Sequence, residues 1–394
     1  MSSIKLFSSL FFVFFAVFLY KKHKSSVKRF LIVTCAFVLL LSAVYHTMFL
    51  GNIDVFKVSW DAMAYASSIF SHTVKIEEFL DFRRGNKMVY IIGIIAQNIF
   101  GKYCSCFSDF FFLLSMINSF ISLCALHVFF VAHNFFRTTS KMLCINSFIF
   151  LQPFTLLRGG IPGADSSILF SLCVFLYAVV SEKPMYVKIL WLFVLSLCHK
   201  MFPIPCALTL AYFSLKLHKK TLRALSVLGC FLLIYYALDL DHLMSILTSH
   251  KQDSTHRLSC NSYIPTCWLP LRCLNFFLAP LLTNCTHFLE RAPNGNILGF
   301  TYAVYVNLII VFMSIRVFIF LLKGGFFSLQ GSRECFIVII IFIVSLSIEG
   351  VYCINYLQTN RHSTSVLSLW IFLMLLISGN AYPGDNSKVD ASVR

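Results

Sequence analysis

Charged residues are scarce in this 394-residue chain: they make up only 12% of it, against about a quarter of an ordinary soluble domain. Acidic residues are the rarer kind, with 16 Asp and Glu against 32 Lys and Arg. Hydrophobic residues make up 58% of the chain, and 44 residues are Phe. This balance excludes a disordered chain, a fibrous repeat and a soluble globule.

Several sequence motifs are also missing. The chain has no GxGxxG, Walker A, HExxH or GxSxG motif, and no pair of CxxC motifs at zinc spacing. Its basic residues are spread between apolar runs and do not gather on one soluble domain, which argues against binding to nucleic acid. We therefore expect no metal, no cofactor and no nucleic-acid partner.

Long apolar runs are what the chain does have. A bilayer core of about 30 Å requires about 20 apolar residues as a helix, and shorter runs are tolerated. We expect eleven spans, at 4–20, 30–50, 107–132, 142–157, 166–181, 185–198, 201–215, 222–238, 297–315, 335–355 and 364–379. The run 88–100 is too short to cross and contains Gln97 and Asn98, so we expect an interfacial or re-entrant helix there.

The predicted fold is thus an all-α integral membrane protein of about 11 transmembrane helices, forming a single domain over residues 1–394. The basic residues predict its orientation, because loops rich in Lys and Arg stay on the cytoplasmic side. The first loop holds five bases and no acid: Lys21, Lys22, Lys24, Lys28 and Arg29. The N-terminus and two large loops, 51–106 and 239–296, are then periplasmic, and the C-terminus is cytoplasmic.

The first large loop contains the stretch VSWDAMAYASS. Asp61 and Tyr65 stand four residues apart in it, so on a helix they share a face. Arg83 and Arg84 come just before the short apolar run. The alternative is a solvated loop of mixed charge.

The stretch LLRGGIPGADSSILF joins two predicted spans. Its glycines and proline break the helix after Arg158, and Asp165 and Ser166 stand where a helix N-cap is expected. A guanidinium beside a helix N-terminus favours an anion such as phosphate. The alternative is a tight outer turn with a snorkelling arginine and a capping acid.

Three further features fall at predicted outer turns. His199 and Lys200 interrupt an apolar stretch, where ionisable groups are costly and histidine suits proton transfer. Arg361 lies before the last span and is a candidate partner for Glu349. Four cysteines lie in the second large loop and allow three disulfide pairings: Cys260, Cys267, Cys273 and Cys285.

The order and sidedness of these features resemble bacterial O-antigen and polysaccharide polymerases of the Wzy and EpsG type. The matching positions are Asp61 with Tyr65, Arg158, the His199–Lys200 pair and Arg361. The sequence departs from the family in two respects. An Arg often precedes the first Asp of the family, whereas only Lys57 is near it here, and the long loop 239–296 is peculiar to this chain.

The resemblance implies an enzyme of the inner membrane that joins oligosaccharide repeat units carried on undecaprenyl diphosphate, on the periplasmic face. Its partners would be that lipid-linked oligosaccharide, membrane lipid and a regulator of chain length. Diphosphate or glycan binding would fall to seven residues: Arg158, Arg361, Arg83, Arg84, Lys200, Tyr65 and Asp165. His199 or Asp61 would be the catalytic base, and no cofactor is implied.

Two other functions remain open at this point. A membrane glycosyltransferase of the GT-C type, which uses a polyprenyl-phosphate sugar, would use Asp61 as its base, but its acidic loop normally follows the first span. A flippase or transporter of lipid-linked oligosaccharide would need polar residues through the midplane of several spans, whereas here they gather at the outer ends.

Overall fold

The computed structural model describes residues 2–48, 50, 60–71, 87–135, 159–199, 202–216, 224, 227–230, 312–329, 333–353 and 369–378. Over these residues the protein is all-helical, with no strand. The main helices are α1 (Ser3–Lys22), α2 (Ser26–Met48), α3 (Trp60–Phe70), α5 (Lys87–Phe100), α6 (Phe107–Phe135), α9 (Asp165–Val180), α10 (Met185–Cys198), α11 (Pro203–Ser214) and α18 (Arg333–Cys353). Short helices Phe312–Leu322, α17 (Gly325–Ser328) and Leu369–Ser378 follow in the last part of the chain.

Three of the described helices are long and apolar enough to cross a membrane: α1, α2 and α6. At about 1.5 Å per residue, the 20 residues of α1 already match the hydrocarbon thickness of a bilayer. The apolar helices make the protein membrane-embedded in character.

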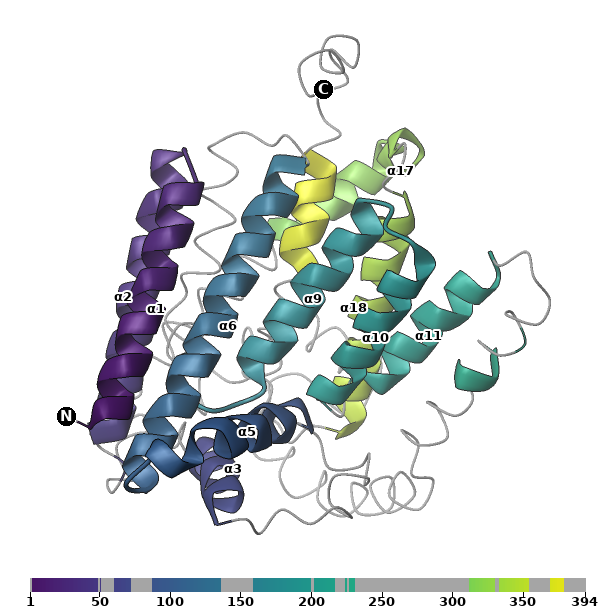
Figure 1. Ribbon diagram of the computed structural model, residues 1–394. Helices are drawn as coiled ribbons and strands as arrows, with labels where there is room; N and C mark the ends of the chain where they lie inside the picture. The colour runs from purple at the N-terminus through teal and green to yellow at the C-terminus, as the bar shows by residue number, and fades with distance from the viewer. Residues whose placement is uncertain are drawn as a thin grey trace, which may run out of the picture.

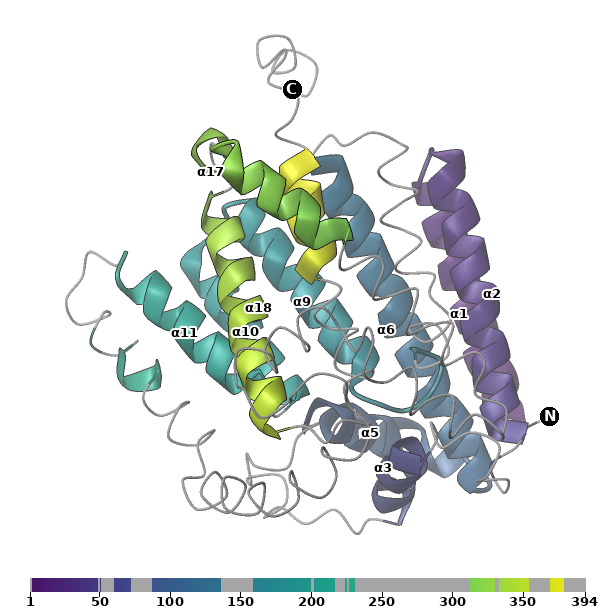
Figure 2. The same cartoon turned by 180° about the vertical axis from the view of Figure 1, so that it is seen from behind.

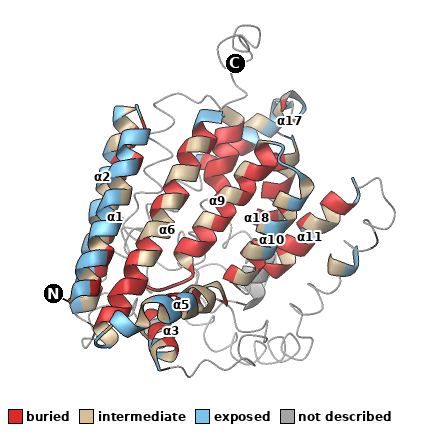
Figure 3. Cartoon of the chain, in the orientation of Figure 1, coloured by how far each residue is buried: buried red, intermediate tan, exposed pale blue. Residues whose placement is uncertain are grey.

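Most helices stand side by side, and α6 and α9 lie at the centre of the bundle (Figures 1 and 2). Figure 3 shows that α6 and α9 are largely buried, whereas α1 and α2 at one edge are largely exposed. Large aromatic side chains stand out from that edge, including Phe7, Phe14 and Phe30, which are 56%, 71% and 66% exposed. Such a surface is suited to lipid chains rather than water.

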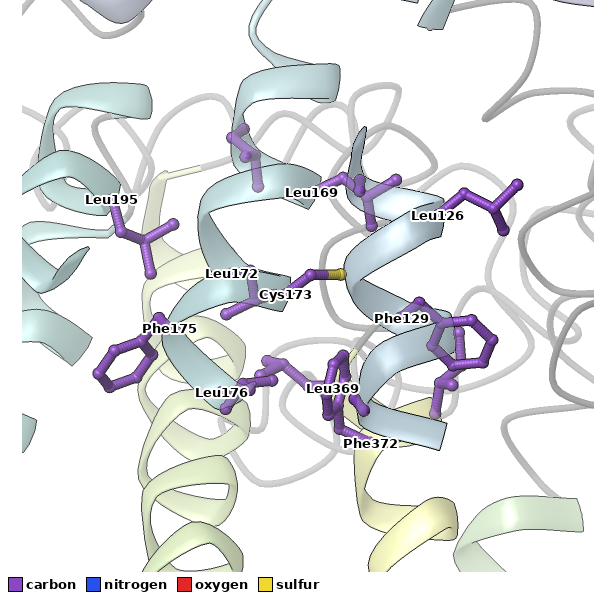
Figure 4. Close-up of a cluster of buried hydrophobic side chains, with 14 of the residues drawn as sticks. Leu126, Phe129, Leu169, Leu172, Cys173, Phe175, Leu176, Leu195, Leu369 and Phe372 are labelled. Carbon is purple, nitrogen blue, oxygen red and sulfur yellow. The ribbon is translucent and has the colours of Figure 1, made fainter. Parts of the chain in front are cut away.

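The core is made of leucine and phenylalanine from helices far apart in sequence. In Figure 4, Phe129 of α6, Leu172 of α9 and Phe372 of the last helix gather with their neighbours in one cluster. Helix α9 is apolar on all sides, which is typical of a helix surrounded by protein.

Helix α5 lies across the ends of the upright helices, close to α3 (Figures 1 and 2). Gly93 permits this close packing, because a Cβ atom there would overlap Ile69 of α3. This crosswise helix coincides with the short apolar run 88–100 that we expected not to cross.

Several predicted spans correspond closely to helices: 185–198 has the bounds of α10, and 166–181 is shifted by one residue from α9. The run 142–157 and the second large loop, with its four cysteines, lie outside the described residues, as does most of 222–238 and 297–315. The total number of spans therefore stays a prediction.

The two ends of the bundle differ in what they carry. We call the end with α3 and α5 the crosswise end. The helices α1, α6 and α9 start at this end, and α2 and α10 end there (Figure 1). At the opposite, basic end, Glu334 receives hydrogen bonds from Lys188 and Lys216, each at 3.2 Å. These bonds tie together α10, α11 and α18.

Candidate functional site

The structure describes the side chains of three predicted site residues, Tyr65, Asp165 and His199. All three belong to the crosswise end: Tyr65 on α3, Asp165 at the start of α9 and His199 just after α10. Asp61 also lies on α3, so the condition for sharing a face with Tyr65 is met, but only the backbone of Asp61 is described. The other predicted site residues lie outside the described residues: Arg83, Arg84, Arg158, Lys200 and Arg361.

The centre of this end is a buried turn, Gly159 to Ala164, which leads into α9. Its first two glycines touch neighbouring helices. A Cβ atom on Gly159 would lie 2.7 Å from Ser122 Oγ of α6, and one on Gly160 would lie 2.8 Å from the Leu39 carbonyl oxygen of α2. At Gly160 the overlap is with backbone, which cannot move aside, whereas at Gly159 the side chains of Ser122 and Leu39 would have to shift. The two glycines therefore pack closely between α2 and α6.

Asn118 of α6 holds the turn from the other side. Its Nδ2 donates to the Ile161 carbonyl oxygen at 2.8 Å, and its Oδ1 accepts from Ser166 Oγ at 2.9 Å. Asn118 and Ser166 are both buried, so these bonds replace water for groups that would otherwise be costly to bury. Sequence reasoning did not single out Asn118; the signal was one amide within the long apolar run 107–132.

A second polar pair on α2 borders the turn. Ser42 lies against Gly160, and His46 is one helical turn further along the same face. His46 Nδ1 is 2.8 Å from the Ser42 carbonyl oxygen, to which it donates. This bond keeps the hydrogen of the neutral ring on Nδ1 and makes Nε2 the basic nitrogen. His46 is thus a buried imidazole beside the glycine turn, and we had not predicted it.

The start of α9 corrects one expectation. The N-cap position is taken by Ala164, without a side-chain hydrogen bond, and Asp165 is the first helical residue. A carboxylate in the first turn interacts favourably with the helix dipole, so it competes with an external anion for the N-terminus of α9. The Asp165 Oδ2 atom also turns back to within 3.8 Å of the Cβ position on Gly163. The N-terminus of α9 is therefore already occupied by a carboxylate of its own helix.

His199 closes the site on the α10 side. It is 7% exposed and extended in backbone, and it ends α10 just after Cys198. Cys198 Sγ lies 3.4 Å from Ser171 Oγ, and this contact joins the end of α10 to α9. Ser171 is less than two helical turns from Asp165 along α9. His199 and Asp165 therefore lie at the same end of the bundle, at the end of α10 and at the start of the adjacent α9.

Tyr65 lies on α3, at the crosswise end. Its ring meets that of Tyr90 on α5 edge to face, with centroids 5.4 Å apart.

At the start of α6, Asp109 accepts hydrogen bonds from Lys5 at 3.1 Å and from Ser2 at 2.8 Å, and these bonds fasten α1 to α6. Burial, with Asp109 and Cys106 close by, raises the pKa of the Cys104 thiol, so this cysteine is a poor nucleophile.

The arrangement offers a buried imidazole, a carboxylate and a closely packed glycine turn, all at one end of a membrane bundle. Groups of this kind can transfer a proton and bind an anion. No known family model, curated protein or solved structure matches the chain.

Proposed function

We propose that this protein is a polysaccharide polymerase that joins oligosaccharide repeat units carried on undecaprenyl diphosphate. In this proposal the chain crosses the bacterial inner membrane about 11 times, with its N-terminus periplasmic, its C-terminus cytoplasmic and its crosswise end facing the periplasm. The observation that supports it most is the closely packed Gly159–Gly160 backbone, which directly follows Arg158 in the chain and lies at the same end as His199.

The argument for Arg158 is one of reach. Consecutive Cα atoms are about 3.8 Å apart, so the Cα atom of Arg158 cannot leave the neighbourhood of Gly159. A rigid anchor for an arginine suits recognition of a diphosphate, because a guanidinium can bind two phosphate oxygens at once. Arg361, Arg83, Arg84 and Lys200 are the further cations of the proposal.

The proposed reaction transfers the growing glycan to a new repeat unit. A hydroxyl oxygen of the new unit attacks the anomeric carbon of the growing chain, and the bond from that carbon to the diphosphate oxygen breaks. The leaving group is undecaprenyl diphosphate, whose developing negative charge the arginines stabilise. The hydroxyl proton passes to a base, His199 or Asp61, so atoms and charge balance without a redox partner.

The surrounding residues have supporting roles in this scheme. Tyr65, held against Tyr90, supplies an aromatic surface for a sugar ring, and Asp165 accepts hydrogen bonds from sugar hydroxyls. Membrane lipid surrounds the bundle, and a separate regulator of chain length is a further partner.

The test uses the gene's own host, with the gene deleted and then restored as variants. We expect Arg158→Ala and Arg361→Ala each to collapse the surface polysaccharide from a ladder to core plus one repeat unit on a silver-stained gel. Lys24→Ala, an exposed residue at the basic end, is the control and should restore the full ladder. Equal ladders in all three strains would show the site assignment to be wrong.

The same gel separates the alternatives. Loss of every repeat unit in the deletion strain would favour a flippase or an earlier transferase, and an intact ladder of altered mobility would favour a GT-C enzyme that adds a side branch. Polymer formed by purified protein from lipid-linked repeat units would exclude a flippase that does no chemistry.

A further inference from the structure

A cluster of basic side chains lies between α1, α2 and α6 at the basic end, opposite the candidate functional site. The basic cluster consists of Lys22, His23, Lys28 and His127. His23 Nε2 lies 3.0 Å from His127 Nδ1, and Lys22 Nζ lies 3.3 Å from His127 Nε2. His23, in the turn after α1, and Lys28, in the first turn of α2, are both buried, although the two helices are largely exposed.

The hydrogen-bond order assigns the protons in the basic cluster. A lysine ammonium can only donate, so His127 Nε2 accepts from Lys22. The hydrogen of the neutral His127 ring is then on Nδ1 and is donated to His23 Nε2. Burial first, then His127, Lys28 and Lys22, lower the pKa of His23 to about 4, so this ring is neutral at pH 7.

The cations of this cluster have no acidic partner within the described part of the chain. The carboxylates that form ion pairs there are Asp109, with Lys5, and Glu334, with Lys188 and Lys216. Lys28 Nζ instead donates to the Phe130 carbonyl oxygen and to Asn134 Oδ1.

More positive charge surrounds the basic cluster on every side. Lys21 at the end of α1 and Lys24 in the turn are exposed, and Arg29 of α2 donates from Nε to the His23 carbonyl oxygen at 2.7 Å. On α6, His133 lies beyond His127 toward the helix end. The N-terminus of α2 also begins here, at Ser26, and adds a partial positive charge.

We propose that the basic cluster binds a phosphate group through Lys22, Lys28 and the two imidazoles. An anion there would offset the charge that no carboxylate among the described residues offsets. The apolar run of α1 ends at Tyr20, so the cluster lies at the level where the headgroups of a membrane begin. The phosphate has two sources, an anionic lipid headgroup or free phosphate in solution, and the chemistry of recognition is the same for both.

One consequence follows from the neutral histidines. A phosphate anion stabilises the protonated form of an adjacent imidazole, so binding is accompanied by proton uptake. We therefore expect tighter binding at pH 6 than at pH 8. Neither this site nor its test depends on the proposed polymerase activity.

The experiment uses the full chain purified in an uncharged detergent. The probes are sodium phosphate, dihexanoyl phosphatidylglycerol and, as a zwitterionic control, dihexanoyl phosphatidylcholine, each titrated by calorimetry at pH 6 and pH 8. Lys22→Gln removes one charged hydrogen bond and should weaken binding about tenfold. Lys24→Gln, an exposed neighbour outside the basic cluster, should change the affinity less than about twofold. His127→Gln should reduce the difference between the affinities for phosphatidylglycerol at pH 6 and at pH 8.

The results distinguish the two sources. Tighter binding of phosphatidylglycerol than of phosphate would assign the site to a lipid headgroup, and the reverse order would assign it to free phosphate. In either case Lys22→Gln must weaken the binding, and Lys24→Gln must leave it unchanged. Absence of binding to both probes, or equal loss in the two lysine variants, would overturn the proposal. Thermal unfolding of each variant without ligand verifies that it is folded.

Discussion

Single residues decide how the turn before α9 packs, and Gly160 is the most constrained of them. A Cβ atom on Gly160 would meet the Leu39 carbonyl oxygen and the Ser42 side chain. Both residues belong to α2, and because α2 is a continuous helix its backbone cannot easily move away. Gly163, three residues later, has no atom closer than 3.8 Å to the same position. The two glycines therefore form a matched pair for mutation.

We expect Gly160→Ala to lower the free energy of unfolding by about 1–3 kcal/mol, the usual cost of overpacking a filled interior. Gly163→Ala should leave it nearly unchanged, because its added methyl meets only ordinary contacts. Thermal unfolding of both variants in the same detergent is the measurement. Equal unfolding midpoints would mean that the turn does not pack against α2 as described.

His23 makes stability depend on pH. Its pKa is lowered to about 4 in the folded protein, by burial first, against an ordinary value of 6.5. The unfolded chain therefore binds a proton between pH 6.5 and about 4 that the folded chain does not, and stability falls as pH decreases through that window. The effect is absent above pH 6.5.

Unfolding midpoints measured from pH 7.5 to 4.5 in phosphate-free buffer test this expectation. The wild-type midpoint should fall more steeply than that of His23→Gln, which has no proton to bind at this position. Parallel curves for the two proteins would show that His23 is not buried in its neutral form.

At the scale of helices, α6 connects the others, since it packs on α1, α2 and α9. Its polar residues divide into two kinds. Asn118 bonds to the turn and to α9, whereas Ser119 donates only to Ser115 of its own helix, at 2.9 Å. Both are buried, so they differ in what they join rather than in exposure.

We expect Asn118→Ala to cost about 1–3 kcal/mol of stability, because the Ile161 carbonyl and the Ser166 hydroxyl lose their partner in a dry interior. Ser119→Ala should cost much less, since it removes no bond between helices. Thermal unfolding of both variants in the same detergent is the measurement. A larger loss for Ser119→Ala would contradict this role of Asn118.

At the scale of the whole molecule, the two ends of the bundle are chemically distinct. The basic end holds Lys22, Lys28 and the Lys188–Glu334–Lys216 group, and the crosswise end holds α3, α5 and the glycine turn. An excess of bases marks the cytoplasmic side of a membrane protein. The two ends of α1 should therefore face opposite compartments.

Epitope tags test this orientation. A tag before Ser2 should bind antibody on spheroplasts with an intact inner membrane, whereas a tag inserted after Lys24 should bind only after detergent permeabilisation. The expression level of each tagged protein, measured on a blot, controls for loss of protein. Binding of the second tag in intact spheroplasts would reverse the orientation.

The sequence alone was sufficient for the helical class and for several helix bounds, because apolar runs interrupted by Lys, Gly and Pro report local structure directly. It also predicted that 88–100 differs from the long helices, since length is a local property. The helical spacing of Asp61 and Tyr65 was equally readable. These inferences need no knowledge of which helix is next to which.

Only the tertiary structure decided which helices are neighbours. Helix α9 is apolar on all sides, so its sequence carries no stripe that identifies a partner. For the same reason Asn118, Ser42 and His46, which lie far from Gly160 in sequence, could not be assigned to its turn. The burial of His23 in the turn after α1 and of Lys28 at the start of α2 is likewise a property of packing against α6. A charge pattern is local, whereas desolvation depends on the neighbours.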